Sequence, residues 1–264
     1  MLSRFLVAGL LGLPLSAQAL HSDVAPSYSA SSVVNAASNL PGPLAPNAIA
    51  SLYGTNLAYS TQSISSSDIH GGILPTVLPG TGVSVLVGGL PANLYYVSPT
   101  QINLLVPVIL LPGESYVQVV IDGLAGPQVP IQLSAAAPAL FELDPHTVVA
   151  IRPDGSLISA DSPAHPGDMV TIFATGLGQT VPPVVYGELP TDAAPLAQLS
   201  AFSVTFDGVA VHPGDIEYAG IAPDFAGLYQ INVRLPVGTH ANPETRIGLG
   251  KSLSPRGIKL PVQP

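Results

Sequence analysis

The chain has 264 residues, a formal net charge of −9 and only 9% charged residues. Its hydrophobic content of 47% excludes a disordered chain, which is poor in apolar residues and rich in net charge. The acidic balance argues against nucleic acid as a partner, because phosphate binding needs clustered Lys and Arg. Since the chain has no cysteine, it has no disulfide, no thiolate metal site and no cysteine nucleophile.

Residues 1–19 have the pattern of a secretory signal peptide. Arg4 gives a positive start, an apolar run follows at 5–15, and 17–19 read Ala-Gln-Ala, the small-x-small pattern of a cleavage site. An apolar run of about 11 residues is too short to span a bilayer, which takes about 20. No second apolar run reaches that length, so we expect an exported protein, periplasmic or extracellular, without an integral membrane segment after cleavage.

The first half, after an exposed leader at 20–32, alternates short apolar runs with turn residues. The stretch 60–79 is rich in Ser, Thr, Gly and Pro, which is typical of a long surface loop. Gly88-Gly89 and Asp122-Gly123 suit hairpin turns, in which two residues need a positive φ. We predict strands at 33–34, 49–53, 82–87, 116–121 and 129–133, and one that contains Gln-Ile-Asn at 101–103.

The second half repeats this pattern. It follows a segment, 142–162, whose Pro-Asp-Gly at 153–155 predicts a small hairpin linking two domains. Residues 229–235 alternate apolar and polar side chains and end at Pro236, which is typical of a half-buried strand. Further strands are predicted within 166–178 and at 202–206, 245–249 and 258–262, with Asp-Gly at 207–208 as a hairpin turn.

Two pairs of aligned residues indicate that the two halves share the same backbone bend. Thr55 aligns with Thr175 in a Thr-x-Leu bend that follows an aromatic residue. Between Thr and Leu, Asn56 aligns with Gly176, and Asn and Gly are the residue types that best tolerate a positive φ. We therefore treat both bends as structural motifs of a repeated domain. The second copy carries ten extra residues before its Gln-Ile-Asn, a candidate surface loop that includes 223–228.

No window of a dozen residues beyond the signal shows helical periodicity free of Pro or Gly. The predicted fold class is all-β, with two tandem immunoglobulin-like β-sandwich domains after a cleaved signal peptide. The first domain is predicted at 33–141, the linker hairpin at 142–162 and the second domain at 163–264.

Ordered motifs run through nearly the whole mature chain, among them Tyr-Val-Ser-Pro-Thr-Gln-Ile-Asn at 96–103 and Ala-Thr-Gly-Leu-Gly at 174–178. With the motifs at 33–39, 45–46, 53–58, 163–168 and 218–223, the chain resembles the uncharacterised secreted C-terminal domain family common in acidobacteria. Its second half also resembles the immunoglobulin-like IPT/TIG fold. The resemblance implies no established activity. Members often form a tail behind other modules, whereas we expect this chain to stand alone.

Catalytic motifs are absent from the sequence. It contains no Gly-x-Ser-x-Gly, no His-Glu-x-x-His and no phosphate loop. The six histidines are scattered singly, so we predict no metal site and no cofactor. Two acidic groupings, 161 with 168 and 215 with 217 and 224, lack the dense spacing of a calcium loop, although a site assembled from loops stays open.

The Gln and Asn of both Gln-Ile-Asn strands lie two residues apart, on one strand face. Gln101 with Asn103, and Gln230 with Asn232, could bind a sugar or a peptide through their amides. The alternative, which we favour, is that these amides satisfy backbone groups of the neighbouring Thr-x-Leu bend, as buried amides usually must. Both copies keep the pair although their loops differ.

Aromatic residues cluster in sequence before the second Gln-Ile-Asn. Phe225, between Asp224 and Ala226 in the inserted loop, is our best candidate for an exposed contact, with Tyr218 and Asp224 as neighbours. Exposed aromatics commonly hold sugar rings or partner proteins, while most of the other aromatics are expected to pack inside.

We therefore predict an exported, non-enzymatic binding or scaffolding protein with an unknown protein or glycan ligand. One alternative is a secreted carbohydrate-active hydrolase, which needs two carboxylates converging in a cleft. Another is a structural subunit that assembles through an exposed sheet edge.

Overall fold

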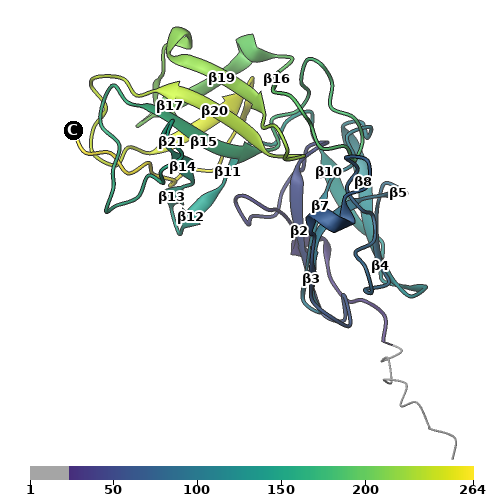
Figure 1. Cartoon of the computed structure of the whole chain (residues 1–264). Helices are drawn as coiled ribbons and strands as arrows, with labels where there is room; N and C mark the ends of the chain where they lie inside the picture. Colours follow the sequence, from purple (N-terminus) through teal and green to yellow (C-terminus); the bar gives the residue numbers. More distant parts are fainter. Residues whose placement is uncertain (1–23) are drawn as a thin grey trace, which may run out of the picture.

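The structure is a computed structural model, and it describes residues 24–264. The predicted signal peptide and the start of the predicted leader, at 20–23, lie outside the described residues. Figure 1 shows two β-rich units, an N-terminal one in purple to teal and a C-terminal one in green to yellow. The all-β prediction is confirmed, because the described chain consists of antiparallel strands with short 3₁₀ turns at η1 (Ala30–Ser32), η2 (Ser66–Asp68), η3 (Leu199–Ala201) and η4 (Pro213–Asp215).

The first unit contains two sheets. One has the order β1-β2-β7-β6-β3, formed by β1 (Val33–Asn35), β2 (Ile49–Tyr53), β3 (Gln62–Ser63), β6 (Asn93–Val97) and β7 (Gln101–Leu105). The other has the order β10-β8-β4-β5 with β9 beside β8, formed by β4 (Val83–Val87), β5 (Leu90–Pro91), β8 (Gly113–Ile121), β9 (Leu124–Ala125) and β10 (Val129–Leu133). Alternate residues of both sheets, such as Leu104 and Val119, share one buried core, so the unit is a β-sandwich.

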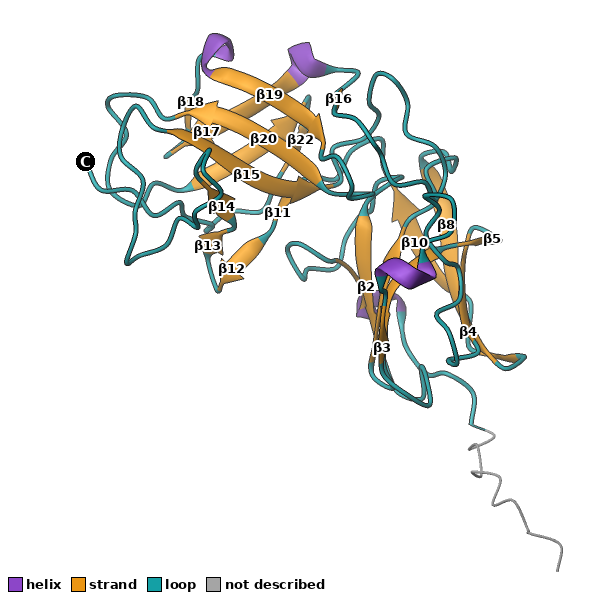
Figure 2. Ribbon diagram, viewed as in Figure 1, coloured by secondary structure: helices purple, strands orange, loops and turns teal. Residues whose placement is uncertain are grey.

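The second unit repeats this plan, as Figure 2 shows. Its larger sheet has the order β11-β15-β20-β19-β16 with β14 also beside β15, formed by β11 (Ala139–Leu140), β14 (Ala150–Ile151), β15 (Met169–Thr175), β16 (Ala194–Pro195), β19 (Ile216–Ile221) and β20 (Tyr229–Arg234). Its partner sheet is formed by β17 (Phe202–Phe206), β18 (Val209–Ala210), β21 (Thr245–Leu249) and β22 (Ser252–Leu253). The central strands β2, β7 and β6 therefore correspond to β15, β20 and β19.

The residues that the sequence assigns to the linker pack with the second unit. A hairpin of β12 (Glu142–Asp144) and β13 (Thr147–Val148) precedes β14, and β11 and β14 both pair with β15. Val148, Ala150 and Ile158 belong to the second core. The two cores divide the chain near residue 134, whereas the predicted first domain ends at 141.

The backbone predictions for the turns are confirmed. Asn56 has φ 55° and Gly176 has φ 78°, as their shared place in the two bends requires. Both residues of each hairpin dipeptide, 88–89, 122–123 and 207–208, also have positive φ.

Three predictions of local structure are wrong. Residues 258–262 form isolated bridges rather than a strand, because Lys259 and Val262 pair with different neighbours and Pro261 has no N–H to donate. Part of the predicted exposed leader packs on the first core through Tyr28, whose hydroxyl accepts from Val119 N at 2.7 Å. The stretch 60–79 is also more than a surface loop, because Leu74 and Leu78 are buried.

Candidate functional site

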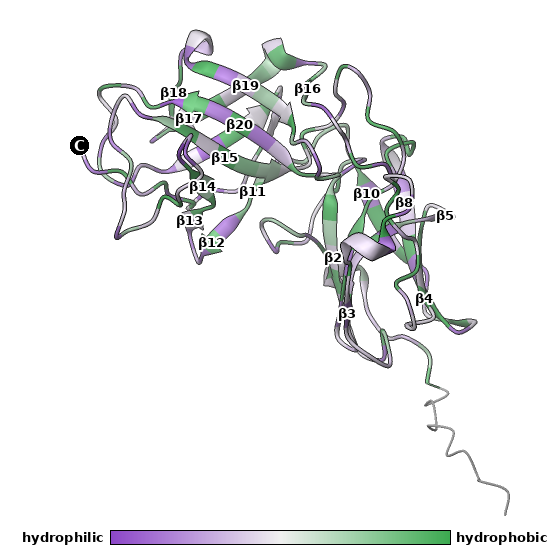
Figure 3. Cartoon of the chain, in the orientation of Figure 1, coloured by the Kyte–Doolittle hydropathy of each residue, from purple (hydrophilic) through white to green (hydrophobic). Residues whose placement is uncertain are grey.

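The outer face of the second unit's larger sheet carries the Gln-Ile-Asn strand. In the register of β15, β20 and β19, Phe173 lies opposite Gln230, and Thr171 opposite Asn232. Asn232 in turn lies opposite Tyr218. Side chains on this face are half-buried, while the alternate residues, such as Ile231, are fully buried in the core. Figure 3 shows hydrophilic positions, in purple, recurring along β19 and β20.

One amide oxygen joins two strands of this face. Asn232 Oδ1 accepts from Gln230 Nε2 at 2.9 Å and from Thr171 Oγ1 at 3.0 Å. The favoured prediction, that the amides satisfy backbone groups of the Thr-x-Leu bend, is therefore wrong. The strand alternation turns these side chains outward, where the hydroxyl of β15 is nearer than the bend. Asn232 Nδ2 donates to no protein group within 24–264, so it remains available to a ligand.

The first unit contains the same network. Asn103 Oδ1 accepts from Gln101 Nε2 at 2.9 Å and from Ser51 Oγ at 2.9 Å. In the neighbouring row, however, Ile49 and Leu105 pack in an apolar cluster with Ala226 and Leu189 of the second unit. The equivalent row of the second unit is Met169 with Arg234, and Arg234 forms an exposed ion pair with Glu217 at 3.0 Å. The sheet face beside the amide network is therefore covered in the first unit and open in the second.

A cavity of about 500 Å³ lies at the end of the open face. Three phenylalanines line it, together with Glu142 and the network residue Gln230, and the full lining is Phe141, Glu142, Val149, Phe173, Ala222, Pro223, Phe225, Leu228 and Gln230. Phe225 is 59% exposed, the most accessible of the three rings. The sequence singled out Phe225 but missed Phe141 and Phe173. Phe173 could have been found, because the alternation of residues 169–175 places it on the same strand face as Thr171.

The loop at 222–228 holds Phe225 from both sides. Its ends are joined by Ala222 N donating to Leu228 O at 2.9 Å, and Asp224 N donates to Pro190 O at 2.7 Å. On the other side, Tyr95 of the first unit donates to Ala226 O at 2.6 Å. Asp224 contributes to the shape of the loop through its backbone, which has a φ of 65°, while its side chain is exposed.

Thr175 connects the bend to both the loop and the first unit. Its Oγ1 donates to Gly227 O at 2.7 Å and accepts from Ile49 N at 2.9 Å. Thr55, its counterpart, is exposed and pairs through its backbone with Ser27. The repeated Thr therefore has a role between the units in one copy alone.

Tyr218 lies on the same face but has used its hydroxyl, which donates to Ile221 O at 2.7 Å. Burial raises the pKa of this phenol above its ordinary value. We therefore expect Tyr218 to offer a ligand its ring rather than its hydroxyl.

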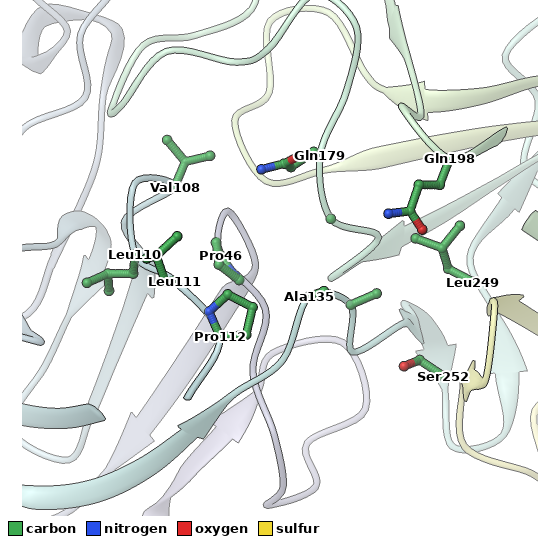
Figure 4. Close-up of a pocket in the computed structure, with 12 residues that line it drawn as sticks. Pro46, Val108, Leu110, Leu111, Pro112, Ala135, Gln179, Gln198, Leu249 and Ser252 are labelled. Atoms are coloured by element: carbon green, nitrogen blue, oxygen red, sulfur yellow. The ribbon is translucent and has the colours of Figure 1, made fainter. Parts of the chain in front are cut away.

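Two other cavities differ in chemistry. One, of about 240 Å³, lies where the units meet, and Figure 4 shows Gln198 and Leu249 across it from the first unit's Pro46, Val108, Leu110, Leu111 and Pro112. Its lining combines aliphatic side chains with Gln179, Gln198 and Ser252 and contains no aromatic ring. The other, of about 150 Å³, is formed by 182–194 and lined by two carboxylates, Glu188 and Asp192.

No three His, Asp or Glu side chains come together to hold a metal ion anywhere between residues 24 and 264. Of the two acidic groupings, Asp168 Oδ2 accepts from His165 N at 2.8 Å, and Glu217 pairs with Arg234. In the same part of the chain, no helix has the length and apolar character needed to cross a membrane.

No protein-family model and no curated protein matches the chain. Among solved structures, it is similar to SGBP-B of the mixed-linkage glucan utilization locus of Bacteroides ovatus, in complex with a mixed-linkage heptasaccharide, at 14% identity over 84% of this chain and a TM-score of 0.31. It is also similar to the surface glycan-binding protein PbSGBP-B of Prevotella bryantii (11%, 90%, 0.28) and to the adhesin InvE of Yersinia pseudotuberculosis (12%, 91%, 0.25).

The chain matches 40%, 43% and 61% of the lengths of those three proteins. At these TM-scores the likenesses carry no argument about function, and the resemblance to the acidobacterial family stays a prediction.

Proposed function

We propose that this protein is an exported, non-enzymatic carbohydrate-binding protein whose ligand lies along the outer face of β15, β20 and β19 and ends against Phe225. The observation that carries the proposal is the cavity at the end of the open sheet face, which three phenylalanines and Gln230 line, with Asn232 two residues further along β20. Stable sheet strands position the amides, and a loop held on both sides positions the exposed ring.

The chemistry of this surface suits a sugar chain. Hexopyranose rings have apolar C–H faces that pack on aromatic side chains, and hydroxyl groups at their edges that exchange hydrogen bonds with amides. Phe225 and Phe173 supply the aromatic surface, while Asn232 Nδ2 and Gln230 Oε1 supply a donor and an acceptor. A mostly apolar site with a few placed polar groups is the usual composition of a ligand pocket.

Charge favours a neutral carbohydrate over an acidic one. The cavity lining contains no Lys or Arg, and its one charged residue is Glu142. Arg234, on the same face, is already paired with Glu217. With a net charge of −9, the chain as a whole repels uronates and sulfated sugars.

A glycan array tests the proposal. The wild-type protein and its Phe225→Ala variant would each be applied to an array of neutral and acidic oligosaccharides. We expect binding to neutral glucan chains, such as cellohexaose, and loss of that binding in the variant. Binding confined to acidic glycans, or equal binding by both proteins, would contradict it.

A second candidate function is a hydrolase, favoured by the pocket that Glu188 and Asp192 line. Two carboxylates in one pocket are the minimum for glycoside hydrolysis. Release of reducing ends from cellohexaose, lost in Glu188→Gln and in Asp192→Asn but kept in Phe225→Ala, would support the hydrolase and displace the first proposal.

A further inference from the structure

We propose that the first unit is part of the binding site of the second, with Tyr95 acting as a positioning residue for Phe225. This inference rests on the proposed function, because it assigns a contact of the first unit to the ring that meets the ligand. Tyr95 itself faces the junction and does not line the cavity.

Tyr95 contacts the loop one residue from the exposed ring. Its hydroxyl donates to Ala226 O at 2.6 Å, a bond across 131 residues of sequence. Ala226 is 4% exposed, so without this donor its carbonyl would stay buried and unpaired. A buried, unpaired carbonyl is unfavourable, which favours movement of the loop until water reaches that oxygen.

The next residue contacts the first unit even more closely. Gly227 has φ +74°, and a Cβ there would lie 2.6 Å from Leu105 Cδ1 and 2.9 Å from Ile49 Cγ1. Thr175 adds a hydrogen-bonded chain from Ile49 N through its Oγ1 to Gly227 O. Two successive residues after Phe225 are thus held by the first unit, while Asp224 before it is held by Pro190.

The inserted loop at 222–228 is not a general packing element of the fold. The inserted loop has no counterpart in the first copy, so the fold of a single unit does not require it. Ala226 and Gly227 are buried and Asp224 is hydrogen-bonded to Pro190 through its backbone, whereas 59% of the surface of Phe225 is exposed. The ring is presented by the junction rather than by its own sheet.

Tyr95→Phe removes this hydroxyl, and Tyr96→Phe is its matched control. Tyr96 is the next residue of β6, and within the described chain its hydroxyl makes no hydrogen bond. Two readouts are needed: amide hydrogen exchange of the peptide covering 222–229, without ligand, and the affinity for cellohexaose measured by calorimetry. For Tyr95→Phe we expect amide exchange at 222–229 to be roughly three- to tenfold faster and the affinity for cellohexaose to be about two- to tenfold weaker. In Tyr96→Phe both quantities should equal those of the wild type.

Unchanged exchange at 222–229 in Tyr95→Phe, or equal acceleration in both variants, overturns the inference. If the wild type does not bind cellohexaose, the proposed function fails on that probe, whereas the exchange result still decides whether Tyr95 positions the loop. Should Tyr95→Phe not fold, Thr175→Val removes the second contact and Thr175→Ser, which keeps the hydroxyl, should restore protection of the loop.

Discussion

Asn232 combines two roles through the two ends of one amide. Its Oδ1 accepts hydrogen bonds from β20 and from β15, which fixes the orientation of the side chain. Its Nδ2 is thereby directed away from these partners, so a fixed donor is presented on the open face. The same arrangement at Asn103 indicates that the network originates in the fold, and that binding would use an orientation the fold already provides.

Substitution of Asn232 should separate these two roles. Asn232→Ala removes the shared acceptor and should lower the free energy of unfolding by about 1–2 kcal/mol. Asn232→Asp keeps an acceptor for both donors and should lose less than half as much, while still losing affinity for cellohexaose. Urea denaturation and calorimetry measure the two effects. Equal destabilisation by both variants would mean that the shared acceptor does not matter.

Tyr229 should make stability sensitive to alkaline pH. Burial raises the pKa of this fully buried phenol from 10.0 to about 12, more than its hydrogen bond with Asn47 lowers it. Because the folded state prefers the neutral phenol, the stability contribution is complete below pH 10 and is lost as pH rises from 10 to about 12. Urea midpoints measured across this range should fall, and should fall less in Tyr229→Phe. Parallel curves for the two proteins would contradict the assignment.

Among elements, the loop at 222–228 has the largest effect on the site. It closes on itself at Ala222 and Leu228, is hydrogen-bonded to the first unit at 226 and to Thr175 of its own unit at 227, and exposes Phe225. It lies between β19 and β20, so it belongs to the strands that carry the amides. The loop therefore couples the sheet face, the exposed ring and the first unit.

Gly227→Ala tests how closely the loop approaches the first unit. The added Cβ meets Leu105 Cδ1 at 2.6 Å at a φ that alanine rarely adopts, so we expect a loss of about 1–3 kcal/mol of stability. Gly238→Ala is the matched control, because a Cβ there has nothing within 4 Å. Thermal denaturation compares the two. A neutral Gly227→Ala would show that the loop has room to move.

The central strands and turns could be predicted well from the sequence, whereas the contacts between strands and loops could not. Strands at 49–53, 129–133, 202–206 and 245–249 have the observed bounds, because period-2 alternation and dipeptide turns are local signals. β6 and β19 were missed, since each contains a bulge that interrupts alternation. Phe225 was found from its exposed sequence context, whereas Phe141 entered the site through the pairing of β11 with β15, a long-range contact without local signal.

In the whole molecule, the two units share an apolar cluster that joins them. Leu105 and Ala226, from different units, are both nearly fully buried in it. The corresponding row of the second unit is Met169 with Arg234, so the position of Leu105 is taken there by a charged residue that is paired with Glu217. One of the two equivalent faces is therefore covered at the junction, and the other is open.

The joined units should unfold together. Leu105→Ala removes a side chain that is 2% exposed and packs at the junction, so we expect the free energy of unfolding to fall by about 2–5 kcal/mol. In calorimetry the wild type should show one unfolding transition, and Leu105→Ala should show two. Leu111→Ala, at a leucine 81% exposed, should change stability by less than about 0.5 kcal/mol. Two transitions already present in the wild type would contradict coupling through this cluster.

Isothermal titration of the protein with cellohexaose measures directly whether the open face with Phe225 binds a neutral sugar chain. We expect saturable binding by the wild type and by Leu111→Ala, and at least tenfold weaker binding by Phe225→Ala, whose melting temperature should stay unchanged because the ring is exposed. Saturable binding that survives Phe225→Ala but is lost in Leu111→Ala would place the ligand in the cavity where the units meet, and would contradict binding at the open face.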